Sequence, residues 1–119
     1  SDVVSLHCPL NDDSHHLIDA DALARMKKSA LLVNTARGAV VDEDALVEAL
    51  ATDEIAGAAL DVFEDEPDVH PGLFDRDRVV LAPHLGSATT ETRREMAHMC
   101  VDAIQAFTNG ADDIPHRVV

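Results

Sequence analysis

Four apolar-rich runs divide the chain, and each ends abruptly in polar residues. They lie at 2–7, 30–33, 55–62 and 78–82. Short runs in which apolar and polar positions do not alternate are typical of parallel strands, because such strands are covered on both faces. We therefore predict four strands at these positions.

The segments between the first three strands carry helix signals. Asp19 is placed to cap a short helix through about Met26, with Lys27 and Lys28 near its carboxyl end, where cations complement the helix dipole. The acids at 42–44 open a second helix, whose apolar positions share one face: Ala45, Leu46, Ala49 and Leu50. Strands that alternate with helices predict an α/β fold with a mostly parallel sheet.

A longer helix is predicted from about Thr89 to Asn109, and Gly110 ends it. Its apolar residues recur at three- and four-residue steps, so we expect one stripe to face the core: Met96, Met99, Cys100, Ala103 and Phe107. Residues 63–77, in contrast, form a long acidic loop with two prolines. Loops of this length inside a compact domain are usually functional.

The composition narrows the class of protein. With 119 residues, 46% of them hydrophobic, the chain can bury a core. Its formal net charge of −14 argues against nucleic acid or an anionic membrane as partner, since both would repel it. The acids are mostly aspartate, sixteen against seven glutamates, beside only two lysines. That balance suits either a protein kept soluble in concentrated salt or an ordinary acidic cytosolic protein.

The cysteines and the hydropathy pattern indicate the compartment. Cys8 and Cys100 match no metal-binding or redox spacing, and no stretch resembles a signal peptide or a membrane span. We therefore expect a reduced, cytoplasmic setting without a disulfide framework.

Candidate chemistry lies where the strands end. Because the carboxyl ends of parallel strands meet at one edge of the sheet, Arg37, Glu66 and His84 can converge although they lie far apart in the sequence. An arginine binds a carboxylate through two hydrogen bonds, and a histidine can give a proton to an oxyanion formed from a carbonyl. A carboxylate bonded to the other ring nitrogen would orient the imidazole. The three residues suit acid–base chemistry on a small anionic substrate.

Simpler roles stay open for each of these residues. Arg37 could pair with one of the many surface acids, and His84 could fill the turn that it occupies. Glu66 shares an acidic loop with Glu64 and Asp65, so the residues alone do not choose between the two glutamates.

The other histidines are not assigned to a site. Neighbours such as His15 and His16 rarely both reach one ion, so no metal site is predicted. We expect five histidines simply at the surface: His15, His16, His70, His98 and His116.

Four motifs follow one another along nearly the whole chain: His7-Cys8-Pro9-Leu10, Asn34-Thr35-Ala36-Arg37-Gly38, the run 61–67 and the run 83–89. In these motifs the chain resembles the D-isomer-specific 2-hydroxyacid dehydrogenases, and within them the glyoxylate/hydroxypyruvate reductases. The resemblance implies a Rossmann-like, doubly wound α/β fold. Residues 1–110 would supply the carboxyl-terminal half of its NAD(P)-binding domain, four strands with flanking helices, and 111–119 a tail leading back toward a substrate domain.

The resemblance also implies residue roles. Arg37 would bind the substrate carboxylate and polarise the keto group, and His84 would protonate the carbonyl oxygen while hydride arrives from the nicotinamide. Glu66, rather than Glu64, would partner His84. The positions that would line NAD or NADP are Pro9, Thr35, Ala36, Arg37, Asp61, His84 and Gly86.

Two parts of that family pattern are not in this sequence. No GxGxxG phosphate loop is present, since the five glycines are isolated, and no amino-terminal substrate domain precedes the first strand. Because a phosphate loop contributes much of the cofactor affinity, we expect a fragment or truncated product that by itself binds NAD weakly or not at all.

The function expected from the resemblance is reduction of a small 2-keto acid, such as glyoxylate or hydroxypyruvate, to the D-2-hydroxy acid by NAD(P)H, in a homodimer. A phosphoglycerate dehydrogenase, a co-repressor-like nucleotide-sensing scaffold and an inactive fragment are the alternatives. Substitution of His84 separates an enzyme from a sensor, because only turnover needs the proton donor.

Overall fold

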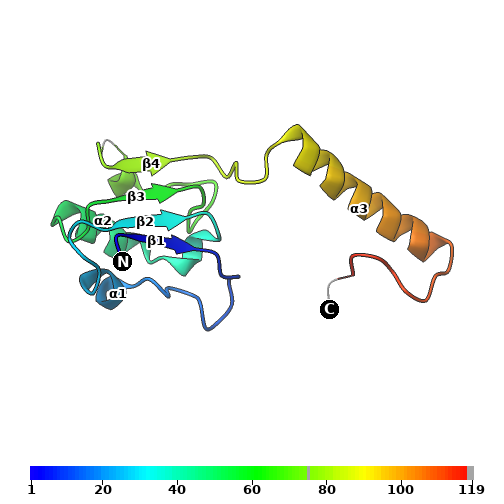
Figure 1. Cartoon of the computed structure of the whole chain (residues 1–119), viewed down its shortest axis with the longest axis horizontal. Helices are drawn as coiled ribbons and strands as arrows, with labels where there is room; N and C mark the ends of the chain where they lie inside the picture. Colours follow the sequence, from blue (N-terminus) through cyan, green and yellow to red (C-terminus); the bar gives the residue numbers. More distant parts are fainter. Residues whose placement is uncertain (75, 118–119) are drawn as a thin grey trace. The chain divides into compact units, whose positions relative to one another are not determined.

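The computed structural model contains one sheet of four parallel strands in the order β1-β2-β3-β4 (Figure 1). The strands are β1 (Val3–Leu6), β2 (Leu31–Asn34), β3 (Gly57–Leu60) and β4 (Val79–Leu81). The register pairs Leu6 with Asn34 and Asn34 with Leu60, so the carboxyl ends of the strands are level. The predicted parallel α/β sheet is confirmed, with strand ends close to those of the apolar runs.

The structure describes residues 1–74 and 76–117. Asp75, in the predicted acidic loop, and Val118 and Val119, at the end of the predicted tail, lie outside the described residues. The chain divides into two compact units, residues 1–86 and 87–119. Within the described ranges, no helix is long and apolar enough to cross a membrane.

Helices α1 (Ala20–Ala24) and α2 (Glu43–Ala51) both begin at an aspartate cap. The side chains of Asp19 and Asp42 each accept a hydrogen bond from the backbone N–H three residues further on, at 2.8 and 2.9 Å. Such a cap satisfies one of the N–H groups that the first turn of a helix leaves unpaired. Both predicted helix starts are confirmed.

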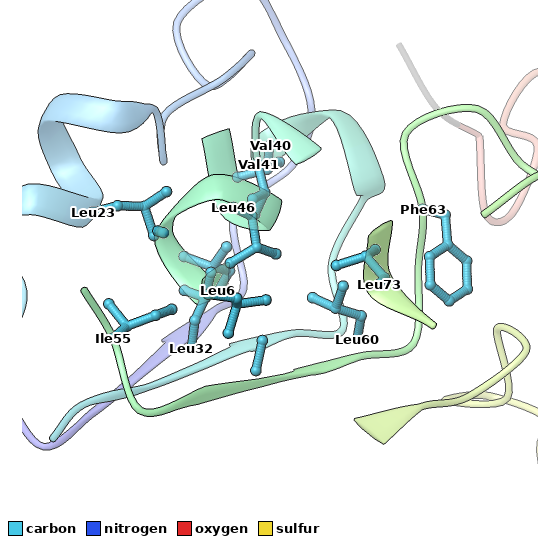
Figure 2. Close-up of a cluster of buried hydrophobic side chains, with 13 residues drawn as sticks. Leu6, Leu23, Leu32, Val40, Val41, Leu46, Ile55, Leu60, Phe63 and Leu73 are labelled. Carbon is cyan, nitrogen blue, oxygen red and sulfur yellow. The ribbon is translucent and has the colours of Figure 1, made fainter. Parts of the chain in front are cut away.

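The core lies between these two helices and one face of the sheet (Figure 2). Leu32 and Leu60 of the sheet pack in one cluster with Leu23 of α1 and Leu46 of α2, and all four are buried. Burying a leucine side chain contributes about 1.5–3 kcal/mol. This layer therefore supplies most of the stability of the first unit.

The other face of the sheet is open. Val3, Leu31 and Val80 project from it and remain exposed, Val80 by 66%. The prediction that the strands are covered on both faces is therefore wrong for this face. In the first unit, the described helices α1 and α2 both pack on the opposite side of the sheet.

Helix α1 ends earlier than predicted. The two residues after Ala24 donate their backbone N–H groups to carbonyls three residues before them, at 3.2 and 2.9 Å, which tightens the last turn and ends the helix. Lys27 and Lys28 therefore lie beyond the helix, and Lys27 Nζ lies 2.9 Å from Oδ1 of Asp2 instead. The prediction that these lysines complement the helix dipole is wrong.

Helix α3 (Thr90–Thr108) dominates the second unit. Thr89 caps it, and Gly110 follows its end with φ of +74°, a left-handed conformation that favours glycine. The predicted start and stop are confirmed. All residues of α3 are described and none is buried, with Phe107 70% exposed, so the prediction of a core-facing stripe is wrong. A helix buries its apolar stripe only against a second layer, and the second unit contains none in its described residues.

Two of the histidines expected at the surface form ion pairs. His16 Nε2 lies 2.6 Å from Oε1 of Glu64 and joins the segment after β1 to the acidic loop. His70 Nε2 lies 3.0 Å from Oδ1 of Asp44. Both rings are half-buried, so the prediction of simple surface residues is wrong for them. The other three of that group are exposed as predicted: His15, His98 and His116.

Gly38 marks the closest approach between two loops at the carboxyl edge of the sheet. It begins the short 3-10 helix η1 (Gly38–Val40). A Cβ added there would lie 1.9 Å from the carbonyl carbon of Phe63 and 2.4 Å from the backbone nitrogen of Glu64. Both neighbours are backbone atoms, so no side-chain rotation could relieve the overlap.

We expect Gly38→Ala to lower the free energy of unfolding of the first unit by about 3 kcal/mol, because the loop backbone must move to admit a methyl group. Denaturant unfolding followed by circular dichroism measures the change. Gly110→Ala is the control for losing a glycine without an overlap: a Cβ there would meet nothing within 4 Å, and the strain from its φ of +74° falls on the second unit. Equal unfolding free energies for Gly38→Ala and the native chain would contradict the expectation.

The His16 ion pair predicts a pH dependence of stability. The hydrogen bond that His16 donates to Glu64 raises the pKa of His16, and burial lowers it by less. A raised folded-state pKa contributes stability that is fully present below the unfolded pKa of about 6.5 and is lost as the pH rises through the folded pKa. We expect the Tm of the first unit to fall as the pH rises above about 6.5 and through the folded-state pKa of His16.

His16→Gln should flatten this part of the pH profile, because glutamine does not titrate. His98→Gln is the control, since His98 is exposed on α3. The same slope of Tm against pH in the His16→Gln variant and the native chain would show that the pair does not stabilise the fold.

Candidate active site

A buried amide shapes the end of β2. Asn34 is 1% exposed, and its side chain turns inward rather than toward a ligand. Its Oδ1 accepts a hydrogen bond from the backbone N–H of Ala36 at 3.0 Å, and its Nδ2 donates to the carbonyl oxygen of Arg37 at 2.9 Å. These bonds close the turn and fix where the chain leaves the strand. Arg37 is thereby delivered to the carboxyl edge of the sheet.

The structure brings Arg37, Glu66 and His84 together. They line one cavity of about 440 Å³, although they follow three different strands. Among residues 1–74 and 76–117, no carboxylate lies within 4.0 Å of the guanidinium of Arg37. Its charge is therefore not used in a surface ion pair in the described part of the chain.

Glu66 and His84 form a direct pair. His84 Nδ1 lies 2.9 Å from Oε2 and 3.1 Å from Oε1 of Glu66, and Oε1 also accepts the backbone N–H of Phe63 at 3.1 Å. The hydrogen bond from His84 is the largest cause that lowers the pKa of Glu66, and the Phe63 N–H and the charge of Arg37 lower it further against burial. Because Glu66 occupies Nδ1, Nε2 is the ring nitrogen that a substrate can reach.

A buried carboxylate supports the turn that carries His84. His84 has φ of +53°, an uncommon left-handed conformation for a residue with a side chain. Asp61, 8% exposed, accepts the backbone N–H of Leu85 through Oδ1 and that of Gly86 through Oδ2, both at 2.7 Å. Charge-assisted bonds of this length are strong, so Asp61 holds the two residues that follow His84. Contact of Asp61 and Gly86 with a cofactor stays a prediction.

A second hollow, of about 740 Å³, lies beside the first. Pro9, Thr35, Ala36 and Arg37 line it, which gathers four of the seven positions that the resemblance connects with NAD or NADP. Its size is that of a small-molecule site, and its walls combine apolar side chains with a hydroxyl and a guanidinium. Arg37 lines both hollows, so the residues present fit a nicotinamide on one side of Arg37 and a small acid on the other.

The two glutamates of the acidic loop have different partners. Glu64 also lines the smaller cavity, but its Oε1 is bound by His16 at 2.6 Å and its Oε2 accepts the backbone N–H of Glu43 at 3.4 Å. Glu66 alone of the two contacts His84. Glu43 accepts the backbone N–H of Glu64 at 2.8 Å and so helps to hold this loop. The sequence by itself did not assign Glu43 to the site, because the helix dipole already explains an acid in the first turn of a helix.

One cluster has the composition of a metal site. His15, His16 and Glu64 each place a possible ligand atom within 4.8 Å of the others. The direct hydrogen bond between His16 and Glu64 explains that proximity without an ion. The absence of a metal site therefore stays a prediction.

Known proteins resemble this chain along its whole length. Residues 1–86 match the family described as D-isomer specific 2-hydroxyacid dehydrogenase, NAD binding domain. The chain is 50% identical over 119 residues to a glyoxylate reductase of Thermococcus litoralis, and this match covers 100% of the chain and 35% of that relative. It is 52% identical over 111 residues to glyoxylate/hydroxypyruvate reductase B of Pectobacterium carotovorum, a match that covers 92% of the chain and 35% of that relative. The chain thus spans about a third of the length of these relatives.

Solved structures share the fold. A glyoxylate reductase from Paecilomyes thermophila superposes with a TM-score of 0.88 at 43% identity, over 98% of this chain and 36% of that one. An NADPH-dependent glyoxylate/hydroxypyruvate reductase from Sinorhizobium meliloti, in complex with NADP and malonate, superposes with a TM-score of 0.89 at 35% identity. The match covers 99% of this chain and 40% of that one. The four parallel strands with flanking helices are therefore Rossmann-like. The chain belongs to the D-isomer specific 2-hydroxyacid dehydrogenase family, whose NAD-binding domain its residues 1–86 match.

Proposed function

We propose that this chain takes part in reducing a small 2-keto acid, of the glyoxylate or hydroxypyruvate type, to the D-2-hydroxy acid with NADH or NADPH. The observation that supports this most directly is the cavity lined by Arg37, Glu66 and His84. A fixed cation and a histidine held by a carboxylate match the two needs of a keto acid, which are an anion partner and a proton donor. The names of the relatives support the substrate class.

Arg37 binds the substrate carboxylate in this proposal. Its guanidinium stays charged at any working pH and offers paired N–H groups that match the two oxygens of a carboxylate. The adjacent keto oxygen then lies near the same positive charge, which stabilises the negative charge that develops on that oxygen.

His84 supplies the proton. When bound, the nicotinamide cofactor supplies the hydride that the carbonyl carbon receives. The Nε2–H of protonated His84 gives its proton to the carbonyl oxygen, and the imidazole becomes neutral. Glu66 holds Nδ1 at 2.9 Å and keeps the ring in place. In the direction of oxidation, neutral His84 takes the hydroxyl proton as the base.

The cofactor would lie along the larger hollow, beside Pro9, Thr35 and Ala36, with Arg37 between it and the substrate. Asp61, directly after β3, and Gly86, in the turn after His84, would complete its surroundings. Both NAD and NADP fit this assignment.

We further propose a homodimer in the cytoplasm, where the free thiols of Cys8 and Cys100 would remain reduced.

His84→Gln tests the proton donor. We expect kcat for glyoxylate or hydroxypyruvate to fall by about 10²–10⁴, because glutamine cannot deliver the proton. NAD(P)H binding, followed by fluorescence, should be retained, because the other six positions assigned to the cofactor are intact. The assay is loss of NAD(P)H absorbance in the full natural polypeptide, with His98→Gln as the control. Undiminished turnover in His84→Gln would contradict the assignment, and no turnover in the native protein with retained nucleotide binding would favour a nucleotide-sensing scaffold.

Arg37→Lys tests the anion partner. Lysine keeps the charge but loses the paired N–H groups, so we expect KM for the keto acid to rise by about tenfold or more. Arg25→Lys, at the exposed end of α1, serves as the control. A KM equal to that of the native protein would mean that another group binds the carboxylate.

A further inference from the structure

Glu43, the first residue of α2, is a carboxylate outside the cavity that is only 6% exposed. Burying a charged group is costly unless hydrogen bonds replace its water. Burial accordingly raises the pKa of Glu43, and the backbone N–H groups of Glu64 and His70 oppose that rise. The Glu43 side chain is therefore directed at the backbone of the acidic loop.

Both donors belong to the loop that carries Glu66. The backbone N–H of Glu64 donates to Oε1 of Glu43 at 2.8 Å, and the N–H of Glu43 donates back to Oε2 of Glu64 at 3.4 Å. At the other end of the segment, the ring nitrogen Nε2 of His70 lies 3.0 Å from Oδ1 of Asp44, the next residue of α2. The first turn of α2 therefore binds both ends of the segment 64–70.

Glu66 lies between these two anchored ends. Fixing the ends of a short segment removes most of its conformational freedom, so the position of Glu66 depends on where Glu64 and His70 are held. The result is visible at the site, where Oε2 of Glu66 lies 2.9 Å from Nδ1 of His84. Glu43 itself is not among the residues that line the cavity.

We propose that Glu43 is a positioning residue: its buried carboxylate binds the start of the segment 64–70, while Asp44 binds His70 at the end, and Glu66 is thereby kept against His84. Its importance for catalysis rests on the proposed function. The geometry it controls is present in the chain without substrate or cofactor, so it can be measured independently.

The test is a carbon-13 NMR titration of the Glu66 carboxyl group in the 119-residue chain. In the native chain the bond to His84 holds the pKa of Glu66 below its ordinary value. We expect Glu43→Ala to move this pKa back toward the ordinary value for glutamate, because the loop no longer presents Glu66 to His84. Glu48→Ala, an exposed glutamate on the same helix, should leave it unchanged.

Glu43→Gln covers the case in which the alanine variant does not fold. Glutamine keeps the shape and one acceptor oxygen but removes the charge that strengthens the bond from the Glu64 N–H. We expect an intermediate shift of the Glu66 pKa, and amide hydrogen exchange at Glu64 about tenfold faster than in the native chain.

A merely structural role for Glu43 would lower the unfolding free energy and leave the pKa of Glu66 unchanged in folded molecules, and that result would overturn the proposal. The proposed function fails on a different result. If the native protein does not reduce glyoxylate or hydroxypyruvate, the enzyme assignment is contradicted. If the Glu66 pKa still depends on Glu43 in that protein, the positioning role is supported.

Discussion

Hydrogen bonds from backbone N–H groups to carboxylates hold the working edge of this protein together. Asp61 fixes the turn after His84, Glu43 fixes the acidic loop, and Glu66 accepts the N–H of Phe63 while it binds His84. A charged acceptor strengthens each bond, and the burial of Asp61 and Glu43 limits competition from water at those two carboxylates. In a chain with net charge −14, these few carboxylates determine the geometry of the site, whereas most of the others stay in solvent.

The parallel register of the sheet brings together the loops that those carboxylates bind. Because all four strands end level, the loops that follow them meet at one edge, and Arg37, Glu66 and His84 line one cavity. Close approach is the second requirement. Gly38 lets the loop after β2 touch the backbone of the loop after β3, where any side chain would separate them.

Apolar surface is left open in both units. One face of the sheet exposes Val3, Leu31 and Val80, and α3 exposes an apolar stripe that includes Met96 and Phe107. Apolar surface on this scale is typical of segments that pack against further structure. In Figure 1 the layer of α1 and α2 covers a single face of the sheet. The chain matches only about a third of the length of its relatives.

The sequence by itself determined the strands, the capped helix starts and the strand-end residues of the site, because apolar runs, aspartate caps and a terminal glycine act over a few neighbouring residues. It also identified the family through four local motifs. The family resemblance implied that Glu66 partners His84, and the tertiary structure places the two in contact. Only the tertiary structure decided that His16 binds Glu64 and that the α3 stripe is uncovered. These outcomes depend on contacts between segments far apart in the chain, and local periodicity shows which face of a helix is apolar but not what lies against it.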